Sequence, residues 1–519
     1  MGFLTGMPGA CLAVSGPGQI HGIAGLANAW SNCWPMVLLG GASFAEQESM
    51  GAFQEAPQIA AAKPFCKYAA RPDSIERVPY FLEVAVRMCT HGRPGAAYID
   101  LPANICMGQS TTEAVTFVPK CPPPPKTLAD PAEVANAIEL LKTAEHPLVI
   151  VGKGAVRIYP PPSSRRPRVL VQMCAACAIL IFRWLVRSQA YGRAEDEMNE
   201  FMNKTQLPFL ASPMGKGVVP DDSPLSVAAG RNAALSGCDV VFLVGARMNW
   251  IMHFGQPPRW APDVKVIQLD IAAEEFGTSI STNGIDSNAC RLCGDAKSVL
   301  GQLNDAVGDW SYPSGTEWWN TLLASVAKNV AFTEEAEKSD AVPMGYFRVF
   351  KELRDLLPRD AIIIAEGANT MDISRTSIPN FLPRKRLDAA TFGTMGIGIG
   401  QLFAAGVVHP DQRIVAIEGD AAFGFSGMEM EAVIRYGLPV TCIVVNNNGI
   451  GGGSSRDPLE GGEENAAFEG GGADPTKWTP GNMGKETRYD LLVRPALTFG
   501  RTFSGEKISA ALSTWCARG

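Results

Sequence analysis

Short runs of apolar residues that end in Gly, Asp or Asn recur along the chain, and stretches with helical periodicity follow them. The clearest runs are HPLVIVGKGA, DVVFLVGARMNW, VKVIQLDI, RIVAIEGD and PVTCIVVNNN. A short continuous apolar run bounded by turn residues is typical of a strand buried on both faces of a parallel sheet. Strands that alternate with helices predict an α/β fold with parallel sheets flanked by helices, in which ligands bind beyond the carboxyl ends of the strands.

Residues 413 to 450 repeat this pattern as one strand–helix–strand unit. RIVAIE is the first predicted strand, MEMEAVIRY the helix and VTCIVV the second strand, and Ser426 to Glu429 has the sequence of a helix capping box. The carboxyl ends of neighbouring parallel strands meet at one edge of a sheet. We therefore expect Asp420 and Asn447, which follow the two strands, to lie close together.

The residues at this expected edge form a set of oxygen ligands. A carboxylate from Asp420, an amide oxygen from Asn447 and a backbone carbonyl near Gly449 leave several coordination positions open. This suits Mg²⁺ bound together with a diphosphate that completes the coordination sphere. The alternative is that Asp420 and Asn447 only cap helices and turns. Gly-Asp alone favours that alternative, whereas Gly-Asp followed after a strand by Asn-Asn favours the metal and diphosphate.

Length and composition divide the chain and limit its partners. The 519 residues predict two to four domains, with a proline-rich linker at 121–131 and a looser connector from Asp309 to Pro343. A net charge of −7 argues against nucleic acid as a partner, although it is compatible with a local basic pocket for a phosphorylated ligand. Thirteen cysteines are too few for a disulfide scaffold, and we expect them to be reduced inside the cell.

The segment VLVQMCAACAILIFRWLV, residues 169–186, is the most apolar stretch. Gln172 and Arg183 interrupt it, and a membrane span needs about 20 mostly apolar residues, so no membrane span is expected. Its Cys174-x-x-Cys177 pair is half of a zinc motif. The second pair, Cys290-x-x-Cys293, lies far away in an ordinary stretch, so no zinc site is expected either.

Several further motifs resemble one enzyme family. VSGPGQIHGIAGLANAWSNCWPMVLLGG, ESMGAFQEAPQ, GRPGAAYIDLPA, GARMNWIMHFG, EGANTMDISR, RLDAATFGTMGIGIG and EGDAAFGFSGMEMEAVIRYGLPV resemble thiamine diphosphate-dependent 2-hydroxyacyl-CoA lyases and the related oxalyl-CoA decarboxylases. The resemblance implies a three-domain architecture: a truncated pyrimidine-binding domain at 1–120, a central nucleotide-fold domain at 128–305 with an atypical insertion near 155–190, and a diphosphate-binding domain at 340–519 with an aberrant end.

The resemblance also assigns the site residues. Mg²⁺ would be held by Asp420, Asn447 and the carbonyl of Gly449. Thiamine diphosphate would contact Ala368, Asn369, Thr370, Gly393, Thr394, Met395, Ala421 and Ala422, with Met395 wedging the cofactor into a bent form. Gln54 and Glu55 are the catalytic candidates, Gln54 through a hydrogen bond to the substrate hydroxyl or thioester oxygen. A packing role for Gln54 stays open.

A second ligand site is expected in the central domain. Lys153 lies in a Gly-Lys-Gly turn after a strand, where it could meet phosphate, and Asp270 ends a strand, where carboxylates grip ribose hydroxyls. The resemblance implies that Arg93, Lys153, Arg247 and Asp270 surround an adenine nucleotide, either ADP as a regulator or part of CoA.

The implied activity is cleavage of a 2-hydroxyacyl-CoA into formyl-CoA and an aldehyde one carbon shorter, in fatty acid alpha-oxidation. Oxalyl-CoA decarboxylase is the alternative, but that branch has Tyr-Glu-Glu where this chain has Phe53-Gln54-Glu55, and the less polar pocket favours an alkyl chain. The resemblance implies a homodimer or homotetramer in the peroxisome. The cytoplasm is the other candidate compartment, because the C-terminus has no peroxisomal signal.

The chain also departs from the family pattern. Family members carry, before the SGPG motif, a glutamate that activates the cofactor, whereas none of the 14 residues before Ser15 is acidic. We therefore expect weak cofactor binding and little catalysis, which leaves open an inactive paralogue or truncated gene product that serves only as a subunit partner. Two further parts are unlike the family, namely the insertion near 155–190 and the sequence after Ile450. An error in the gene model would explain both of them and the missing glutamate.

Overall fold

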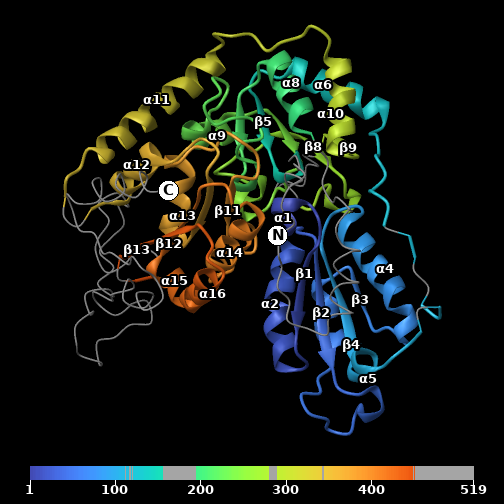
Figure 1. Ribbon diagram of the computed structural model, residues 1–519. Coiled ribbons are helices and arrows are strands. Elements are labelled where there is room, and N and C mark those ends of the chain that lie inside the picture. Colours follow the sequence, from blue (N-terminus) through green and yellow to red (C-terminus); the bar gives the residue numbers. More distant parts are fainter. Residues whose placement is uncertain are drawn as a thin grey trace.

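The protein consists of three parallel sheets, each flanked by helices and each in its own lobe (Figure 1). The computed structural model describes residues 1–450 except 112, 116, 117, 120, 156–193, 280–288, 342, 343 and 448. All strand pairs within the three sheets are parallel, and this confirms the α/β class predicted from the apolar runs. The division of the chain at 120, 128, 305 and 340 stays a prediction.

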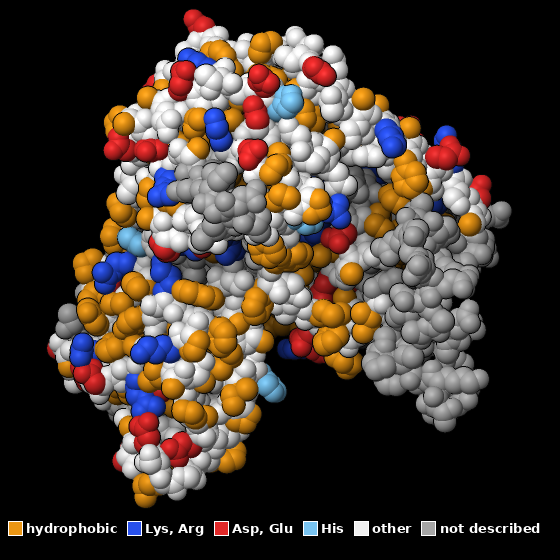
Figure 2. All heavy atoms as spheres, turned by 180° about the vertical axis from the view of Figure 1, so that it is seen from behind, with side chains coloured by type: hydrophobic (Ala, Val, Ile, Leu, Met, Phe, Trp, Pro, Cys, Tyr) orange, Lys and Arg blue, Asp and Glu red, His pale blue; other side chains and the backbone are white. Residues whose placement is uncertain are grey.

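The N-terminal sheet has the strand order β1-β2-β4-β3. Its strands are β1 (Gly9–Ala13), β2 (Met36–Ala42), β3 (Tyr68–Ala70) and β4 (Ala96–Pro102). Its helices are α1 (Gly2–Thr5), α2 (Pro17–Ser31), α3 (Gln58–Ala62), α4 (Val78–Thr90) and α5 (Ala103–Met107). Every residue of the inner strand β4 is buried, whereas the edge strand β1 is mostly exposed. Seen from behind, this lobe carries many apolar side chains on its surface (Figure 2).

The central sheet has the strand order β6-β5-β7-β8-β9. Its strands are β5 (Pro147–Val151), β6 (Phe209–Ala211), β7 (Val240–Val244), β8 (Lys265–Asp270) and β9 (Cys290–Cys293), and its helices are α6 (Pro131–Thr143), α8 (Glu195–Thr205), α9 (Arg231–Gly237) and α10 (Ala296–Val307). Residues 121–130 form neither helix nor strand, as the prolines predicted. Asp130 ends this linker and caps α6, because its side chain accepts a hydrogen bond from the N–H of Ala132.

The predicted loose connector from Asp309 to Pro343 is wrong over most of its length. It contains the longest described helix, α11 (Glu317–Glu337). The Thr316 side chain caps the helix by accepting from the N–H of Trp319. Trp318 and Leu322 are buried in the core of the central lobe. The charged composition of the later part hid this helix, because its exposed turns carry the charges while the first turns bury the aromatic residues.

The C-terminal sheet has the strand order β11-β10-β12-β13. Its strands are β10 (Ile362–Glu366), β11 (Arg386–Asp388), β12 (Ile414–Gly419) and β13 (Thr441–Val445), and its helices are α12 (Tyr346–Leu356), α13 (Ala368–Ser377), α14 (Gly398–Val408), α15 (Asp420–Ser426) and α16 (Met430–Arg435). The two strands predicted between 413 and 450 are therefore present as the parallel pair β12 and β13.

The helical part of this unit differs from the prediction. Helix α15 begins at Asp420, directly after β12, and ends at Ser426, while α16 begins only at Met430. The predicted capping box at Ser426 is wrong, because the chain is already helical when it reaches Ser426 and this side chain makes no cap hydrogen bond. Gly437, with φ of 60°, follows α16 and turns the chain toward β13.

Two predictions concern residues outside the described part of the chain. The apolar stretch 169–186 with Cys174 and Cys177 lies there, as does the sequence after Ile450. Among the described residues, no helix has the length and apolar character needed to cross a membrane. The same part of the chain contains no group of three or more His, Cys, Asp or Glu side chains placed to hold a metal ion.

Candidate cofactor site

The ends of β10 and β12 meet at one edge of the C-terminal sheet. These strands pair in register from Ile362 with Ile414 to Glu366 with Glu418, so the glycines that follow them, Gly367 and Gly419, lie side by side. A Cβ atom at Gly367 would lie 3.2 Å from the backbone of Gly419. The two main chains therefore approach so closely that a larger residue at Gly367 would push the Gly419 main chain away. With no side chain at either glycine, a ligand can approach the main chain at this edge.

The structure brings Asp420 and Asn447 together at this edge. The N–H of Gly449 donates to Asp420 Oδ2 at 3.1 Å and to Asn447 Oδ1 at 3.2 Å. Asp420 is buried and its Oδ1 also accepts from the N–H of Ala421, and the Asn447 Nδ2 donates to the hydroxyl of Tyr346 at 3.1 Å. A carboxylate and an amide oxygen thus point to one place, which is the donor set that Mg²⁺ prefers.

The residues predicted at the diphosphate begin two helices at the same edge. Ala368, Asn369 and Thr370 form the first turn of α13, and Ala421 and Ala422 lie in the first turn of α15. The first N–H groups of a helix lack partners within the helix and carry partial positive charge. The first turns of α13 and α15 therefore suit an anionic group, which a cation would link to the Asp420 carboxylate.

The residues predicted at the aminopyrimidine lie in the segment that follows β11 and leads into α14. Residues 393–398, which include Gly398 as the first residue of α14, are called the 393–398 loop below. The N–H groups of Gly396 and Gly398 both donate to the carboxylate of Glu366. Thr394 Oγ1 is buried and has no hydrogen-bond partner among the described residues, which is a feature that a ligand would satisfy. Met395 is partly exposed, with 37% of its surface accessible. The loop therefore fits the predicted contact with a bound group.

Glu366 and Glu418 are site residues that the sequence analysis missed. They lie side by side in register on the neighbouring strands β10 and β12, and both are buried. Burial raises the pKa of Glu366, against the effect of the N–H groups of Gly398 and Gly396 that donate to it. Burial, and next the charge of Glu366, raise the pKa of Glu418 well above its usual range. The signal in the sequence was a Glu-Gly pair after each of two apolar runs, AEG and IEG.

The catalytic candidates Gln54 and Glu55 lie in the loop before α3. Gln54 Oε1 accepts from the Ser15 hydroxyl at 3.2 Å. The Glu55 carboxylate accepts from the N–H groups of Ser49, Gly51 and Ala52, and these hydrogen bonds lower its pKa. Glu55 therefore stabilises the turn at 49–52, and main-chain N–H groups stabilise its negative charge.

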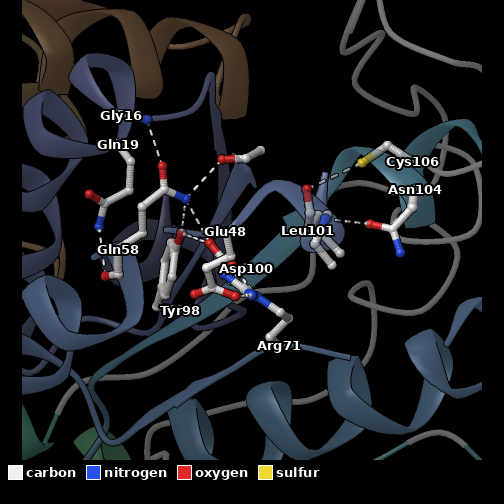
Figure 3. Close-up of polar contacts among 12 residues, drawn as sticks. Gly16, Gln19, Glu48, Gln58, Arg71, Tyr98, Asp100, Leu101, Asn104 and Cys106 are labelled. Atoms are coloured by element: carbon white, nitrogen blue, oxygen red, sulfur yellow. Dashed lines mark hydrogen bonds and ion pairs between the residues drawn. The ribbon is translucent and has the colours of Figure 1, made fainter. Parts of the chain in front are cut away.

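A polar network behind this loop was also missed (Figure 3). Gln58 lies at its centre, where its Oε1 accepts from the N–H of Gly16 at 2.6 Å and its Nε2 donates to Tyr98 and to Asp100 Oδ1. Tyr98 donates to the same carboxylate at 2.6 Å, and Arg71 Nε donates to Asp100 Oδ2 at 2.7 Å. The network ties the Ser15-Gly-Pro-Gly turn to the inner strand β4, so it positions the loop that carries Gln54.

The four residues predicted to surround a nucleotide line one pocket of the central lobe: Arg93, Lys153, Arg247 and Asp270. Arg93 lies 3.8 Å from Asp270 and also pairs with Glu275. Burial lowers the pKa of Lys153 to about 8 and raises the pKa of Asp270. Three partly buried cationic side chains at one pocket favour an anionic ligand.

This pocket adjoins both other lobes. The Lys153 ammonium donates to the carbonyl of Asn32, at the end of α2. Arg247 donates to the carbonyl of Ser31 at 2.7 Å and lies 3.4 Å from the hydroxyl of Thr391, two residues before the 393–398 loop. The N–H of Thr391 donates to the Asn32 side chain at 3.0 Å, so the three lobes meet here.

Comparison with known proteins agrees with this geometry. Three descriptions match: "Thiamine pyrophosphate enzyme, N-terminal TPP binding domain" over residues 1–62, the "central domain" over 187–303 and the "C-terminal TPP binding domain" over 366–474. The chain is 45% identical to 2-hydroxyacyl-CoA lyase 1 of Mus musculus over 466 residues, 89% of this chain and 73% of the relative.

Two further relatives give the same picture. The chain is 44% identical to 2-hydroxyacyl-CoA lyase 1 of Homo sapiens, over 88% of this chain and 73% of the relative. It is 39% identical to oxalyl-CoA decarboxylase of Escherichia coli, over 88% of this chain and 74% of the relative. The chain therefore belongs to the thiamine pyrophosphate enzyme family.

Proposed function

We propose that the protein is a thiamine diphosphate- and Mg²⁺-dependent lyase that cleaves a 2-hydroxyacyl-CoA into formyl-CoA and an aldehyde one carbon shorter. The observation that carries this proposal is the meeting of Asp420 and Asn447 at the N–H of Gly449, beside the first turns of α13 and α15. The two 2-hydroxyacyl-CoA lyases at 44–45% identity support the reaction class.

Each group of residues has one task in this proposal. Asp420, Asn447 and the carbonyl of Gly449 would hold Mg²⁺, and the first turns of α13 and α15 would receive the diphosphate. The 393–398 loop would hold the aminopyrimidine, with the Thr394 hydroxyl as a partner for it. When bound, the cofactor supplies the acceptor for the electron pair released as the carbon–carbon bond breaks.

The pocket lined by Arg93, Lys153, Arg247 and Asp270 would take an adenine nucleotide, as part of CoA or as ADP. Its guanidinium and ammonium groups suit phosphate oxygens, which accept charge-assisted hydrogen bonds. The Asp270 carboxylate at the end of β8 suits ribose hydroxyls. Titration with ADP and with CoA tests which nucleotide binds.

The oxalyl-CoA decarboxylase at 39% identity supports a second candidate reaction. Residues 53–55 favour the lyase, because Gln54 offers a neutral amide where the decarboxylase branch has a carboxylate. Mass spectrometry of the products separates the two. Formyl-CoA formed from a 2-hydroxyacyl-CoA supports the lyase, and formyl-CoA formed only from oxalyl-CoA supports the decarboxylase.

A third candidate is a non-catalytic partner of an intact subunit. It is favoured by Glu55, whose carboxylate is engaged by three main-chain N–H groups. No turnover of either substrate, together with retained subunit association, would support this candidate over the two enzymes.

We also propose a homodimer or homotetramer. Large apolar side chains are exposed on the N-terminal lobe and near the candidate cofactor loops, including Val14, Phe53, Phe425 and Met428, at 62% or more of their surface. Sedimentation analysis tests the assembly. The proposed compartment is the peroxisome, with the cytoplasm as the alternative, and imaging of a fluorescent fusion distinguishes them.

The central experiment is calorimetric titration with thiamine diphosphate in the presence and absence of Mg²⁺. Wild-type protein is expected to bind the cofactor only with Mg²⁺, and Asp420→Ala is expected to lose that binding. Asp411→Ala, an exposed aspartate of the same lobe, is the matched control and is expected to bind like wild type. Binding by Asp420→Ala with unchanged Mg²⁺ dependence would contradict the assignment.

A further inference from the structure

A buried pair of carboxyl groups lies directly behind the candidate cofactor site. Glu366 ends β10 and Glu418 lies beside it in register on β12, with 1% and 0% of their surfaces exposed. A buried carboxylate is costly unless main-chain or side-chain donors stabilise it. Glu366 has such donors, because the N–H groups of Gly396 and Gly398 point to its two oxygens.

These donors tie Glu366 to one specific segment. Gly396 and Gly398 belong to the loop that also contains Gly393, Thr394 and Met395. Glu366 is also followed at once by Gly367 and then by α13, whose first turn is the candidate diphosphate site. One side chain therefore sets the position of the loop relative to the start of that helix.

Glu418 lies beside Glu366 and contacts the same loop. A Cβ atom at Gly398 would lie 2.0 Å from Glu418 Oε1, so the glycine leaves the space that the Glu418 side chain fills. Both carboxyl groups therefore contact the loop: Glu366 accepts from its N–H groups, and Glu418 packs against the bare Cα of Gly398. Neither contact depends on residues outside the described part of the chain.

We propose that Glu366 is a positioning residue that fixes the 393–398 loop in the shape that receives the aminopyrimidine of the cofactor. The assignment of the loop to the cofactor rests on the proposed function. The tie between Glu366 and the loop does not. Glutamine at this position would offer one acceptor oxygen and would turn an NH₂ group toward a main-chain N–H, so one loop amide would lose its acceptor.

The first test measures amide hydrogen exchange in the apo-protein. In wild type, the N–H groups of Gly396 and Gly398 are expected to exchange slowly, because both donate to the buried carboxylate of Glu366. In Glu366→Gln, exchange across residues 393–398 is expected to rise at least about tenfold. Glu133→Gln is the matched control, because Glu133 also accepts a main-chain N–H, that of Arg291 in the central lobe, and it is expected to leave the loop unchanged.

The second test measures cofactor binding with Mg²⁺ for the same variants. Glu366→Gln is expected to raise the dissociation constant of thiamine diphosphate about tenfold and to leave the Michaelis constant for the acyl-CoA unchanged. Glu366→Asp keeps the charge but shortens the side chain, so an intermediate effect is expected. A role in overall stability alone would lower the melting temperature without this separation between cofactor and substrate.

The outcomes keep the two proposals apart. If wild type binds no thiamine diphosphate, the proposed function fails, and the exchange measurement alone decides whether Glu366 holds the loop. If wild type binds the cofactor but its Gly396 and Gly398 amides exchange as fast as exposed loop amides, the positioning role is overturned. Should Glu366→Gln not fold, Gly398→Ala takes its place. That variant displaces Glu418 and is expected to weaken cofactor binding in the same way, and wild-type affinity would overturn the role.

Discussion

Replacing Lys153 by methionine separates folding from ligand binding at the central pocket. The Lys153 side chain is partly buried beside two arginines, Arg93 and Arg247, and burial lowers its pKa from 10.5 to about 8. A pKa below that of the unfolded chain means that the unfolded state binds the proton more tightly. Protonated Lys153 therefore destabilises the fold, and we infer that an anionic ligand offsets this cost.

The magnitude follows from the pKa. The fall from 10.5 to about 8 corresponds to about 3 kcal/mol, because one pKa unit is worth about 1.4 kcal/mol. Methionine removes this cost but leaves the carbonyl of Asn32 without its donor, which costs about 1 to 2 kcal/mol. We therefore expect Lys153→Met to stabilise the ligand-free protein by about 1 to 2 kcal/mol at pH 7. For a domain of 150 to 250 residues this raises the Tm by about 2 to 8 °C.

The pH dependence has a definite sign. Between pH 8 and 10.5 the unfolded state holds more protons than the folded state, so wild-type stability rises with pH in this window. The advantage of Lys153→Met should therefore be full below pH 8 and shrink toward pH 10. Differential scanning calorimetry at pH 7 and pH 10 measures this, and Lys142→Met, at an exposed lysine, is the control without effect.

Binding should change in the opposite direction from stability. Lys153→Met is expected to weaken ADP or CoA binding at least about tenfold, because a charge-assisted hydrogen bond to phosphate is lost. A less stable Lys153→Met, or a gain in stability that does not change with pH, would refute the reasoning about burial. Unchanged affinity for both nucleotides would refute the assignment of the pocket.

Three further predictions test other parts of the molecule. Asn447→Ala should weaken Mg²⁺-dependent cofactor binding less than Asp420→Ala in calorimetry, because it removes a neutral oxygen and leaves the carboxylate in place; an equal or larger loss would contradict this. Tyr98→Phe should lower the free energy of unfolding by about 1 to 2 kcal/mol, since Asp100 loses a buried donor, and an unchanged Tm would argue against the network. Burial lowers the pKa of His409 to about 4, so the unfolded state binds the proton more tightly than the folded state. The free energy of unfolding should therefore fall by about 2 kcal/mol from pH 6.5 toward pH 4, after allowance for partial exposure. His409→Gln should lose this pH dependence, and a variant with the same pH profile of stability as wild type would contradict the prediction.

Local sequence determined the strands and the meeting of the loops that follow them. The apolar runs at β5, β7, β8 and β12 need no partner to be recognised, because a strand buried on both faces is apolar throughout. The run at β13 was recognised in the same way, although this edge strand is only partly buried. Once two such strands are parallel, their carboxyl ends lie at one edge, so the convergence of Asp420 and Asn447 followed from the spacing alone.

Helix boundaries were less well determined by sequence. The capping box at Ser426 has the right residues, but the chain already becomes helical at Asp420 because β12 ends there and the next strand lies on the same sheet. The helix α11 was hidden by its charged surface, and only the burial of Trp318 and Leu322 against the central lobe explains why it forms.

Only the tertiary structure decided which distant residues act together. The pairing of Glu366 with Glu418 depends on strand register, which a one-residue slip would abolish, and register is set by the packing of the whole sheet. The polar network around Gln58 likewise links Gly16 to Asp100 through hydrogen bonds, although these residues are far apart in the sequence. Sequence determines which segments are strands and which side chains end them. The register and packing of those segments determine which side chains touch, because that depends on contacts between residues far apart in the chain.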